Sequence, residues 1–191
     1  LIADNLGIQD YIKNTYNLNA KYIAYGADIF GSPNSKILKD YNLEAEKFIL
    51  CIGRIEPENN YEMIFKSYLD AKLKIPLVII GNHLTTYGDY LKDKFKNKNI
   101  FFFGPIYKKV VLDNLRYFSK LYIHGHSVGG TNPSLIEAMS AGALVLVHRN
   151  KFNLSVLSNK KLSFSNSNDL KKLLLDKYLY WLILYYKHNL E

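Results

Sequence analysis

The loop of residues 125–134 combines residue types that suit the binding of an anion. Gly129 and Gly130 allow the backbone to approach a ligand without an intervening Cβ. Asn132 followed by Pro133 is typical of the N-cap and first residue of a helix. Because the free N–H groups and the dipole at a helix start attract negative charge, this pattern predicts a site for a phosphate-like group.

Two charged side chains could complete the chemistry near this loop. Glu137 lies about one turn inside the predicted helix, where a carboxylate can accept hydrogen bonds from sugar hydroxyls, most naturally a ribose diol. Arg54 ends another apolar run and offers a planar fork that binds phosphate oxygens. The residues alone leave a simpler alternative open, in which the glycines only form a tight turn and Glu137 is a solvated acid.

The hydrophobic pattern defines the scaffold that must hold these residues. Apolar runs rich in Val, Ile, Leu and Phe predict strands at 21–25, 47–54, 75–81, 99–104, 120–125, 143–148 and 162–164. Helical spacing predicts helices at 5–15, 60–72, 87–95, 108–118, 133–141 and 168–188. Nearly continuous apolar strands that alternate with helices indicate an α/β fold, a Rossmann-like doubly wound parallel sheet covered on both faces.

Ligands of such sheets bind beyond the carboxyl ends of the strands. Three predicted loops begin at a strand end and are therefore candidate binding segments. They are Gly53-Arg54 and the residues after it, Gly104-Pro105-Ile106, and residues 125–134.

The chain has 191 residues and a net charge of +8, with a sequence pI of 9.3. Such a charge suits an anionic partner, which could be a phosphate-bearing substrate, an anionic membrane surface or nucleic acid. The lysines are scattered and partly balanced by acids, unlike a basic arm, so no nucleic-acid partner is expected. The sequence contains no run of about 18 apolar residues, and no transmembrane helix is predicted.

The length is enough for one substantial domain with its own core. The single cysteine, Cys51, excludes an internal disulfide framework and lies in an apolar run, so we expect a buried structural thiol. The N-terminal residues show neither a methionine nor the pattern of a signal peptide. We therefore expect the chain to be a piece of a longer protein.

Four segments resemble the motifs of one protein family, in the family's order. They read IADNLGIQDYI with KYIAYGAD (2–12 and 21–28), CIGRIEPENNYEMIF (51–65), FFFGPIYKKVVLDNL (101–115) and SVGGTNPSLIEAMSAGALVLVH (127–148). These segments resemble the retaining GT-B glycosyltransferases of family 4, in their donor-binding domain. The patterns PENN and GGTNPSL are most similar to a bacterial rhamnosyltransferase-like subgroup. The resemblance covers about residues 2–153.

The resemblance implies that the chain is the C-terminal half of a GT-B fold. Residues 1–25 are expected to be the hinge and a remnant of the N-terminal acceptor domain, residues 26–166 the nucleotide-sugar-binding domain, and residues 167–191 a C-terminal helix. The implied function is transfer of a sugar, with rhamnose as one candidate, from a nucleotide-sugar to a cell-surface glycan acceptor. The alternative is a non-catalytic nucleotide- or protein-binding module from a truncated glycosyltransferase.

The resemblance also implies partners. The donor is a nucleotide-diphosphate sugar, for which dTDP-rhamnose is a candidate, and no separate cofactor or metal is expected. The other partners are a glycan or lipid-linked acceptor and the missing N-terminal GT-B domain. Without that domain we expect weak nucleotide binding and no sugar transfer. The expected location is the cytoplasm, either free or in peripheral contact with the inner face of the plasma membrane.

By matching position, the resemblance assigns catalysis to Arg54 and Glu137 and the nucleotide base to the backbone at 104–106. His126 is expected either to contact the donor or to be an ordinary turn residue. The expected donor-binding residues are Gly53, Asn59, Gly104, Pro105, Ile106, His126, Gly129, Gly130, Thr131, Asn132, Pro133, Ser134 and Leu135.

Two positions depart from the family's pattern. The second glutamate of the family's E-x7-E motif matches Glu137, but the first falls on Gly129. The lysine that follows the family's Gly-Arg is Asn59 here. Loss of the lysine removes a cation from the expected diphosphate site. Loss of the acid, which usually faces the donor sugar, would suit a deoxy sugar with fewer hydroxyls.

The sequence lacks the Asp-x-Asp pair on which many glycosyltransferases hold a metal ion. His124 and His126 lie two residues apart, with no carboxylate or cysteine cluster to complete a metal site. Arg54 and the helix start at 132–135 are therefore expected to act together as an electrostatic clamp on the leaving diphosphate.

The C-terminal segment 173–190 is rich in Leu, Tyr and Trp, with lysines at its edges. Three interpretations stay open. The segment packs on this domain's own sheet, exposes an apolar face that pairs with another copy or a missing domain, or lies at a membrane surface.

Overall fold

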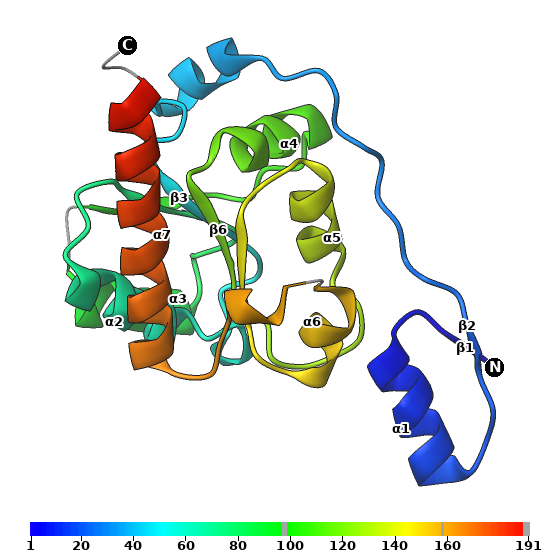
Figure 1. Cartoon of the computed structure of the whole chain (residues 1–191). Helices are drawn as coiled ribbons and strands as arrows, with labels where there is room; N and C mark the ends of the chain where they lie inside the picture. The colour runs from blue at the N-terminus through cyan, green and yellow to red at the C-terminus, as the bar shows by residue number, and fades with distance from the viewer. Residues whose placement is uncertain (97–98, 158, 189–191) are drawn as a thin grey trace.

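The computed structural model describes residues 1–96, 99–157 and 159–188, with side chains up to residue 177. Most of the chain forms an α/β domain, and a small N-terminal unit lies beside it (Figure 1). The strands of the main sheet are β3 (Ile49–Ile52), β4 (Leu77–Ile80), β5 (Ile100–Phe103), β6 (Leu121–His124), β7 (Val145–His148) and β8 (Ser163–Phe164). The helices of this domain are α2 (Tyr61–Ala71), α3 (Thr86–Lys94), α4 (Lys109–Phe118), α5 (Pro133–Ser140), α6 (Lys151–Val156) and α7 (Ser167–His188).

The six strands are parallel and lie in the order β5-β4-β3-β6-β7-β8. The chain moves outward from β3 through β4 to β5, returns to β6 beside β3, and then moves outward in the other direction. Strand order therefore reverses between β3 and β6, which is where ligands bind in doubly wound sheets. The predicted Rossmann-like parallel sheet is confirmed.

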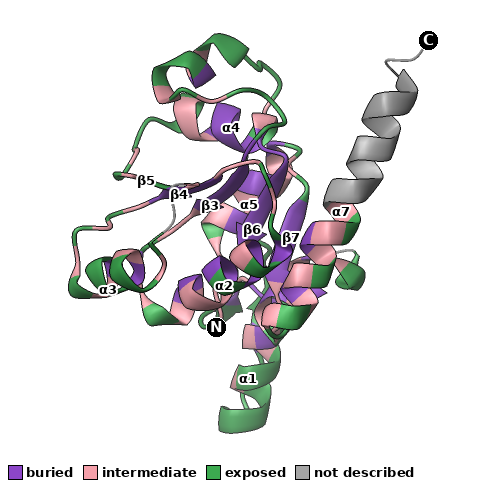
Figure 2. Ribbon diagram, turned by 90° about the vertical axis from the view of Figure 1, so that its left-hand side faces the viewer, coloured by how far each residue is buried: buried purple, intermediate pink, exposed green. Residues whose placement is uncertain are grey.

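The core has two layers because alternate residues of each strand face opposite sides of the sheet. In β3, Ile49 and Cys51 pack with α2, α3 and α7, whereas Leu50 packs with α4 and α5 on the other face. Strands β3, β4, β6 and β7 are largely buried (Figure 2). Cys51 lies in this core as predicted, and burial raises the pKa of its thiol.

The N-terminal unit consists of β1 (Ile2–Ala3), α1 (Leu6–Tyr16) and β2 (Lys21–Tyr22). The two short strands pair with each other in parallel and form a separate sheet. The predicted strand 21–25 is shorter than expected, because its pairing with β1 ends where Ile23 donates to the carbonyl of Ala3 (3.0 Å). β1 was not predicted, since two residues show no periodicity.

An extended segment links this unit to the main domain and follows the outer side of α5 and α4 (Figure 1). The hydroxyl of Ser140 donates to the carbonyl of Asp28, and the backbone N–H of Asn34 donates to Asn114 Oδ1 (2.6 Å). The segment then enters the 3-10 helix η1 (Ser35–Tyr41), whose Leu38 joins the core beside α4. The segment that precedes the main sheet, from Asp28 to Leu38, is thereby held against α4 and α5.

Helix α7 packs against α2, and its Leu170 and Leu174 are buried in the core. This start of the C-terminal helix thus covers the domain's own sheet. The interpretations of the segment 173–190 that depend on side chains beyond residue 177 lie outside the described residues. No helix in the described part of the chain is long and apolar enough to cross a bilayer. The short helix α6, which Asn150 caps by accepting from Phe152 N and Asn153 N, was not predicted.

Two glycines at strand ends permit close approach of backbone segments. A Cβ on Gly81, after β4, would lie 2.1 Å from the carbonyl oxygen of Gly53, after β3. A Cβ on Gly125, after β6, would lie 2.1 Å from the carbonyl oxygen of Asn59. Both contacts are with backbone, so no side-chain rotation can relieve them.

We expect Gly81→Ala to lower the free energy of unfolding by about 1–3 kcal/mol, because the added methyl group forces strand ends apart. Gly104→Ala is the matched control: Gly104 also follows a strand, yet its Cβ would meet nothing within 4 Å. The control should change stability by less than about 1 kcal/mol, or raise it slightly. Urea unfolding of both variants measures the difference. Equal stability would contradict the close approach.

Candidate functional site

A cavity of about 200 Å³ lies at the carboxyl ends of β3 and β6, where the strand order reverses. Its walls come from the residues after β3, the turn before α2, the residues after β6 and the start of α5. The predicted site residues among its lining are Gly53, Arg54, Asn59, His126, Asn132 and Ser134. Gly53 and Ser134 therefore line one cavity, although 81 positions separate them in the sequence.

A second cavity of about 230 Å³ is lined by residues after β3, β4 and β5. It contains Pro105 and Ile106, the predicted base-binding residues, together with Gly53 and Arg54. Gly53 and Arg54 therefore border both cavities. Gly104 precedes this lining without being part of it.

The start of α5 is built as the sequence predicted. Asn132 caps the helix, with its Oδ1 accepting from the backbone N–H of Ser134 (3.0 Å), and Pro133 is the first helical residue. Asn132 and Ser134 both line the first cavity, so the positive end of the helix dipole lies at its wall. The side chain of Leu135 is buried in the core instead.

Arg54 lines both cavities, and its guanidinium carries a permanent positive charge. No lysine or other arginine of the described residues is part of either lining. Its side chain is 71% exposed and pairs with Glu56 (Nη1 to Oε2, 3.3 Å). Burial lowers the pKa of His126, and the charge of Arg54 lowers it further. The guanidinium therefore acts electrostatically on His126, in the loop after β6, as expected if the two loops converge.

Asn59 performs a structural task at the position where a cation was expected. Its side chain donates to the carbonyl of Arg54 (Nδ2 to O, 2.6 Å), and only 6% of the residue is exposed. Two further bonds join this turn to the loop after β6. Asn60 donates to the carbonyl of Gly125 (2.7 Å), and Ser127 Oγ donates to the carbonyl of Glu58 (2.7 Å). Neutral polar groups thus hold the cavity walls together.

Three histidines gather at the ends of β6 and β7. Burial lowers the pKa of His124 to about 3, helped by the nearby His126 and His148. Asn153 donates to the carbonyls of both His126 (2.9 Å) and His148 (2.8 Å), which ties the two strand ends to α6. Among the described residues no three His, Cys, Asp or Glu side chains gather in a way that could hold a metal ion.

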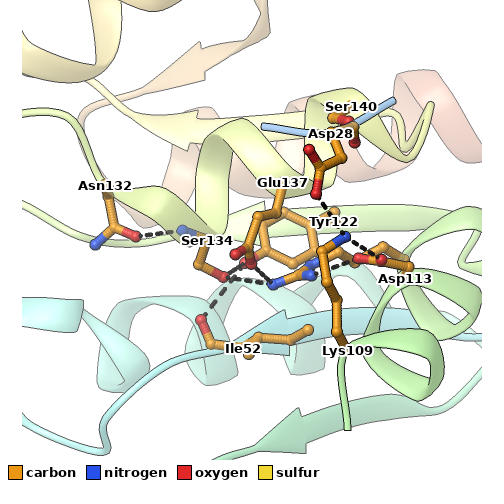
Figure 3. Close-up of polar contacts among 10 residues, drawn as sticks. Asp28, Ile52, Lys109, Asp113, Tyr122, Asn132, Ser134, Glu137 and Ser140 are labelled. Atoms are coloured by element: carbon orange, nitrogen blue, oxygen red, sulfur yellow. Dashed lines mark hydrogen bonds and ion pairs between the residues drawn. The ribbon is translucent and has the colours of Figure 1, made fainter. Parts of the chain in front are cut away.

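Glu137 points toward the side of α5 that faces α4 (Figure 3). Its Oε2 lies 2.5 Å from Nη2 of Arg116, a buried arginine on α4. The same Nη2 lies 3.4 Å from Ser134 Oγ, which is 2.7 Å from the hydroxyl of Tyr122. Glu137 is not part of either cavity lining, but Ser134 connects it to the first one.

The loop between β6 and α5 meets the N-terminal unit. Gly129 has a φ of 89°, which favours glycine, and nothing lies within 4 Å of an added Cβ. A Cβ on Gly130 would lie 3.1 Å from Asp4 Oδ1. Thr131 Oγ1 donates to the carbonyl of Asp4 and accepts from Asn5 Nδ2 (3.0 Å each). Gly129, Gly130 and Thr131, like Pro133, are absent from both cavity linings.

Sequence reasoning missed Asp4, Asn5 and Arg116. Asp4 and Asn5 contact a loop more than 120 residues later, which no local pattern reveals. Arg116 lies in a helix with ordinary amphipathic spacing, and only the spatial position of Glu137 shows why the arginine is buried. An arginine on the apolar face of a predicted helix was the one available signal.

The sequence matches the family model described as glycosyl transferases group 1 over residues 34–179. The chain belongs to this family. No curated protein sequence matches it significantly.

This group 1 domain is similar in fold to several solved structures. A glycosyltransferase from Rickettsia africae has a TM-score of 0.80 at 14% identity, covering 93% of this chain and 52% of that one. HepE from Anabaena, in complex with UDP and glucose, has a TM-score of 0.74 at 17% identity, covering 92% of this chain and 52% of that one. The chain thus spans about half the length of these proteins.

The C-terminal domain of LpcC from Francisella tularensis, a group 1 family protein, has a TM-score of 0.65 at 16% identity. The match covers 78% of this chain and 86% of that domain. The fold is therefore that of the C-terminal domain of a GT-B glycosyltransferase, as the sequence predicted.

We expect His124 to make the group 1 domain less stable in mild acid. Its pKa falls from an ordinary value of 6.5 to about 3 on folding. Below pH 6.5 the unfolded chain therefore binds a proton that the folded chain does not, and stability is lost as the pH falls. Between pH 7 and pH 5 this histidine should cost about 2 kcal/mol.

Urea unfolding at pH 7, 6 and 5 tests this, with His124→Gln as the comparison. The variant lacks the titrating group, so its stability should fall less steeply than that of the wild type. His126 and His148 remain in both proteins, and they cancel in the difference. Parallel stability curves for the two proteins would contradict a buried, neutral His124.

Proposed function

We propose that this domain binds the nucleotide-sugar donor of a group 1 glycosyl transferase. One observation carries the proposal. Arg54, at the end of β3, and the capped start of α5 line the same cavity at the point where strand order reverses. A guanidinium binds phosphate oxygens through charge-assisted hydrogen bonds, and the free N–H groups of a helix start bind them with the help of the helix dipole.

In this proposal the diphosphate lies in the first cavity, between Arg54 and the N–H groups of α5. The base lies in the adjoining cavity against Pro105 and Ile106, because Arg54 borders both spaces. The ribose then lies toward Glu137, whose carboxylate accepts hydrogen bonds from its hydroxyls. Gly53, which borders both cavities, supplies backbone close to the ligand.

The chemistry follows from this placement. During transfer the bond between the anomeric carbon and the diphosphate oxygen breaks, and negative charge grows on the leaving diphosphate. Arg54 and the helix start both line the cavity that would hold this charge, so they can stabilise it electrostatically. The sugar becomes electron-poor at the anomeric carbon and is attacked by an acceptor hydroxyl. His126, whose pKa is lowered by burial and by Arg54, lies on the same wall.

We propose a deoxyhexose such as rhamnose, carried by dTDP, as one donor sugar. Gly129 supports this choice, because no side chain is present there to bind an additional hydroxyl and nothing else lies within 4 Å of the Cβ position. HepE and TarM are similar in fold and were solved in complex with UDP. UDP and dTDP are therefore the first probes to compare.

Further proposals concern the remainder of the enzyme. Residues 1–25 act as the hinge to an acceptor-binding domain, residues 26–166 bind the donor, and α7 (Ser167–His188) is the C-terminal helix. Sugar transfer to a glycan or lipid-linked acceptor requires that second domain. The net charge of +8 supports peripheral contact with an anionic membrane.

A second candidate function is a non-catalytic module that holds a nucleotide or a protein. Asn59 favours it, since a neutral, buried amide occupies a position where the diphosphate site of relatives would gain a cation. In such a module Arg54 would contribute little to binding.

We expect Arg54→Ala to weaken binding of the preferred nucleoside diphosphate about tenfold or more, because a charge-assisted contact to phosphate is lost. Lys47→Ala is the matched control. Lys47 lies at the opposite end of the same strand, is 61% exposed and pairs with Glu44, much as Arg54 pairs with Glu56. The control should bind like the wild type.

Calorimetric titration of UDP, dTDP and GDP into the three proteins measures this effect. Absence of binding of all three nucleotides to the wild type would overturn donor binding. Binding that survives unchanged in Arg54→Ala would favour the non-catalytic module.

A further inference from the structure

Arg116 is the largest side chain that is fully buried in the described part of the chain. Only 2% of its side chain is exposed, and its Nε has no hydrogen-bond partner among the described residues. Burial of a guanidinium costs much free energy unless the charge is paired with good geometry. Its burial between α4 and α5 therefore calls for an explanation.

The contacts of Arg116 divide between two carboxylates. Nη1 lies 3.1 Å from Asp113 Oδ1 on the same helix, and Nη2 lies 2.5 Å from Glu137 Oε2 on α5 (Figure 3). Asp113 has a second cation, Lys109 (2.7 Å). The side chain of Glu137 has Arg116 as its ion-pair partner and forms no other ion pair or hydrogen bond with described residues. Arg116 thus fixes one oxygen of Glu137 and leaves the other oxygen available.

Arg116 and Glu137 differ in solvent exposure, although an ion pair that only stabilises the fold would not require one exposed member. Arg116 is buried, whereas the Glu137 side chain is 35% exposed. Nη2 of Arg116 also contacts Ser134 Oγ, and Ser134 lines the cavity at the start of α5. Arg116 therefore lies behind the cavity wall and holds a carboxylate at the edge of that wall.

We propose that Arg116 is a positioning residue, which orients Glu137 so that its free oxygen accepts hydrogen bonds from the pentose hydroxyls of the donor, which are the 2′- and 3′-hydroxyls in UDP or GDP and the 3′-hydroxyl in dTDP. The guanidinium occupies Oε2 of Glu137. It also fixes the rotamer relative to Ser134 and the α5 start. This inference rests on the proposed function, since it needs a nucleotide in the adjoining cavities.

The test compares a ribose nucleotide with its 2′,3′-dideoxy counterpart. The probes are UDP or GDP, whichever binds the wild type more tightly, each with its dideoxy analogue, titrated calorimetrically into the 191-residue chain. The measured quantity is the dissociation constant of the dideoxy nucleotide divided by that of the ribose nucleotide. A structural defect weakens both ligands equally and leaves this ratio unchanged, whereas loss of carboxylate positioning lowers it.

We expect the wild type to prefer the ribose nucleotide about tenfold, as a hydrogen bond to a charged acceptor provides. Glu137→Gln and Arg116→Met should bring the ratio close to one. Arg116→Lys, which keeps the charge but loses the fork, should lower the ratio about threefold. Lys109→Met is the matched control, because Lys109 is the other partner of Asp113 and forms no ion pair with Glu137, and it should keep the wild-type ratio.

The outcomes separate this inference from the function on which it rests. Failure of the wild type to bind either nucleotide overturns the proposed function itself. Equal binding of ribose and dideoxy nucleotides by the wild type overturns the inference alone. If Arg116→Met does not fold, Arg116→Lys decides: an unchanged ratio in that variant overturns the positioning role.

Discussion

The site depends on the close packing of backbone at the carboxyl ends of β3 and β6. Because the strand order reverses between them, the chain leaves these neighbouring strands in opposite directions and a crevice opens. Asn60 and Ser127 bond across the crevice, and Gly125 lets the two backbones touch without an intervening Cβ. These contacts place Arg54 and the start of α5 on one cavity.

The electrostatics of the crevice are unevenly distributed. Arg54 is exposed and only loosely paired, so it can turn toward a ligand at little cost. Arg116 is buried and pairs with two carboxylates, so its role is to hold other groups in place. Burial keeps His124 neutral. An anion in the first cavity would therefore meet one mobile cation and a fixed helix dipole, rather than a dense positive cluster.

The sequence allowed the local features to be predicted. The run IPLVIIG predicted a buried strand, because an uninterrupted apolar run suits a sheet covered on both faces, and β4 forms there. Asn132-Pro133 gave the start of α5 because capping depends on adjacent residues. The fold class followed from the alternation of such elements.

Contacts between distant residues could not be predicted in this way. Glu137 was predicted to be a ligand-binding acid, which stays a prediction, but its pairing with Arg116 depends on how α4 packs on α5. The bonds of Thr131 to Asp4 and Asn5 cross more than 120 residues. β1 and α6 were missed because two residues and six residues are too few for a periodic signal.

The central claim is that Arg54 and the first turn of α5 bind one diphosphate together. An amide NMR titration of the chain with UDP or dTDP tests it most directly. The account predicts that the backbone N–H signals of Gly53, Arg54, Ser134 and Leu135 shift together, with one dissociation constant. Shifts confined to the amino ends of the strands, around Lys47 and Lys120, would contradict it. Different dissociation constants for the signals of Gly53 and Arg54 and for those of Ser134 and Leu135 would also contradict it.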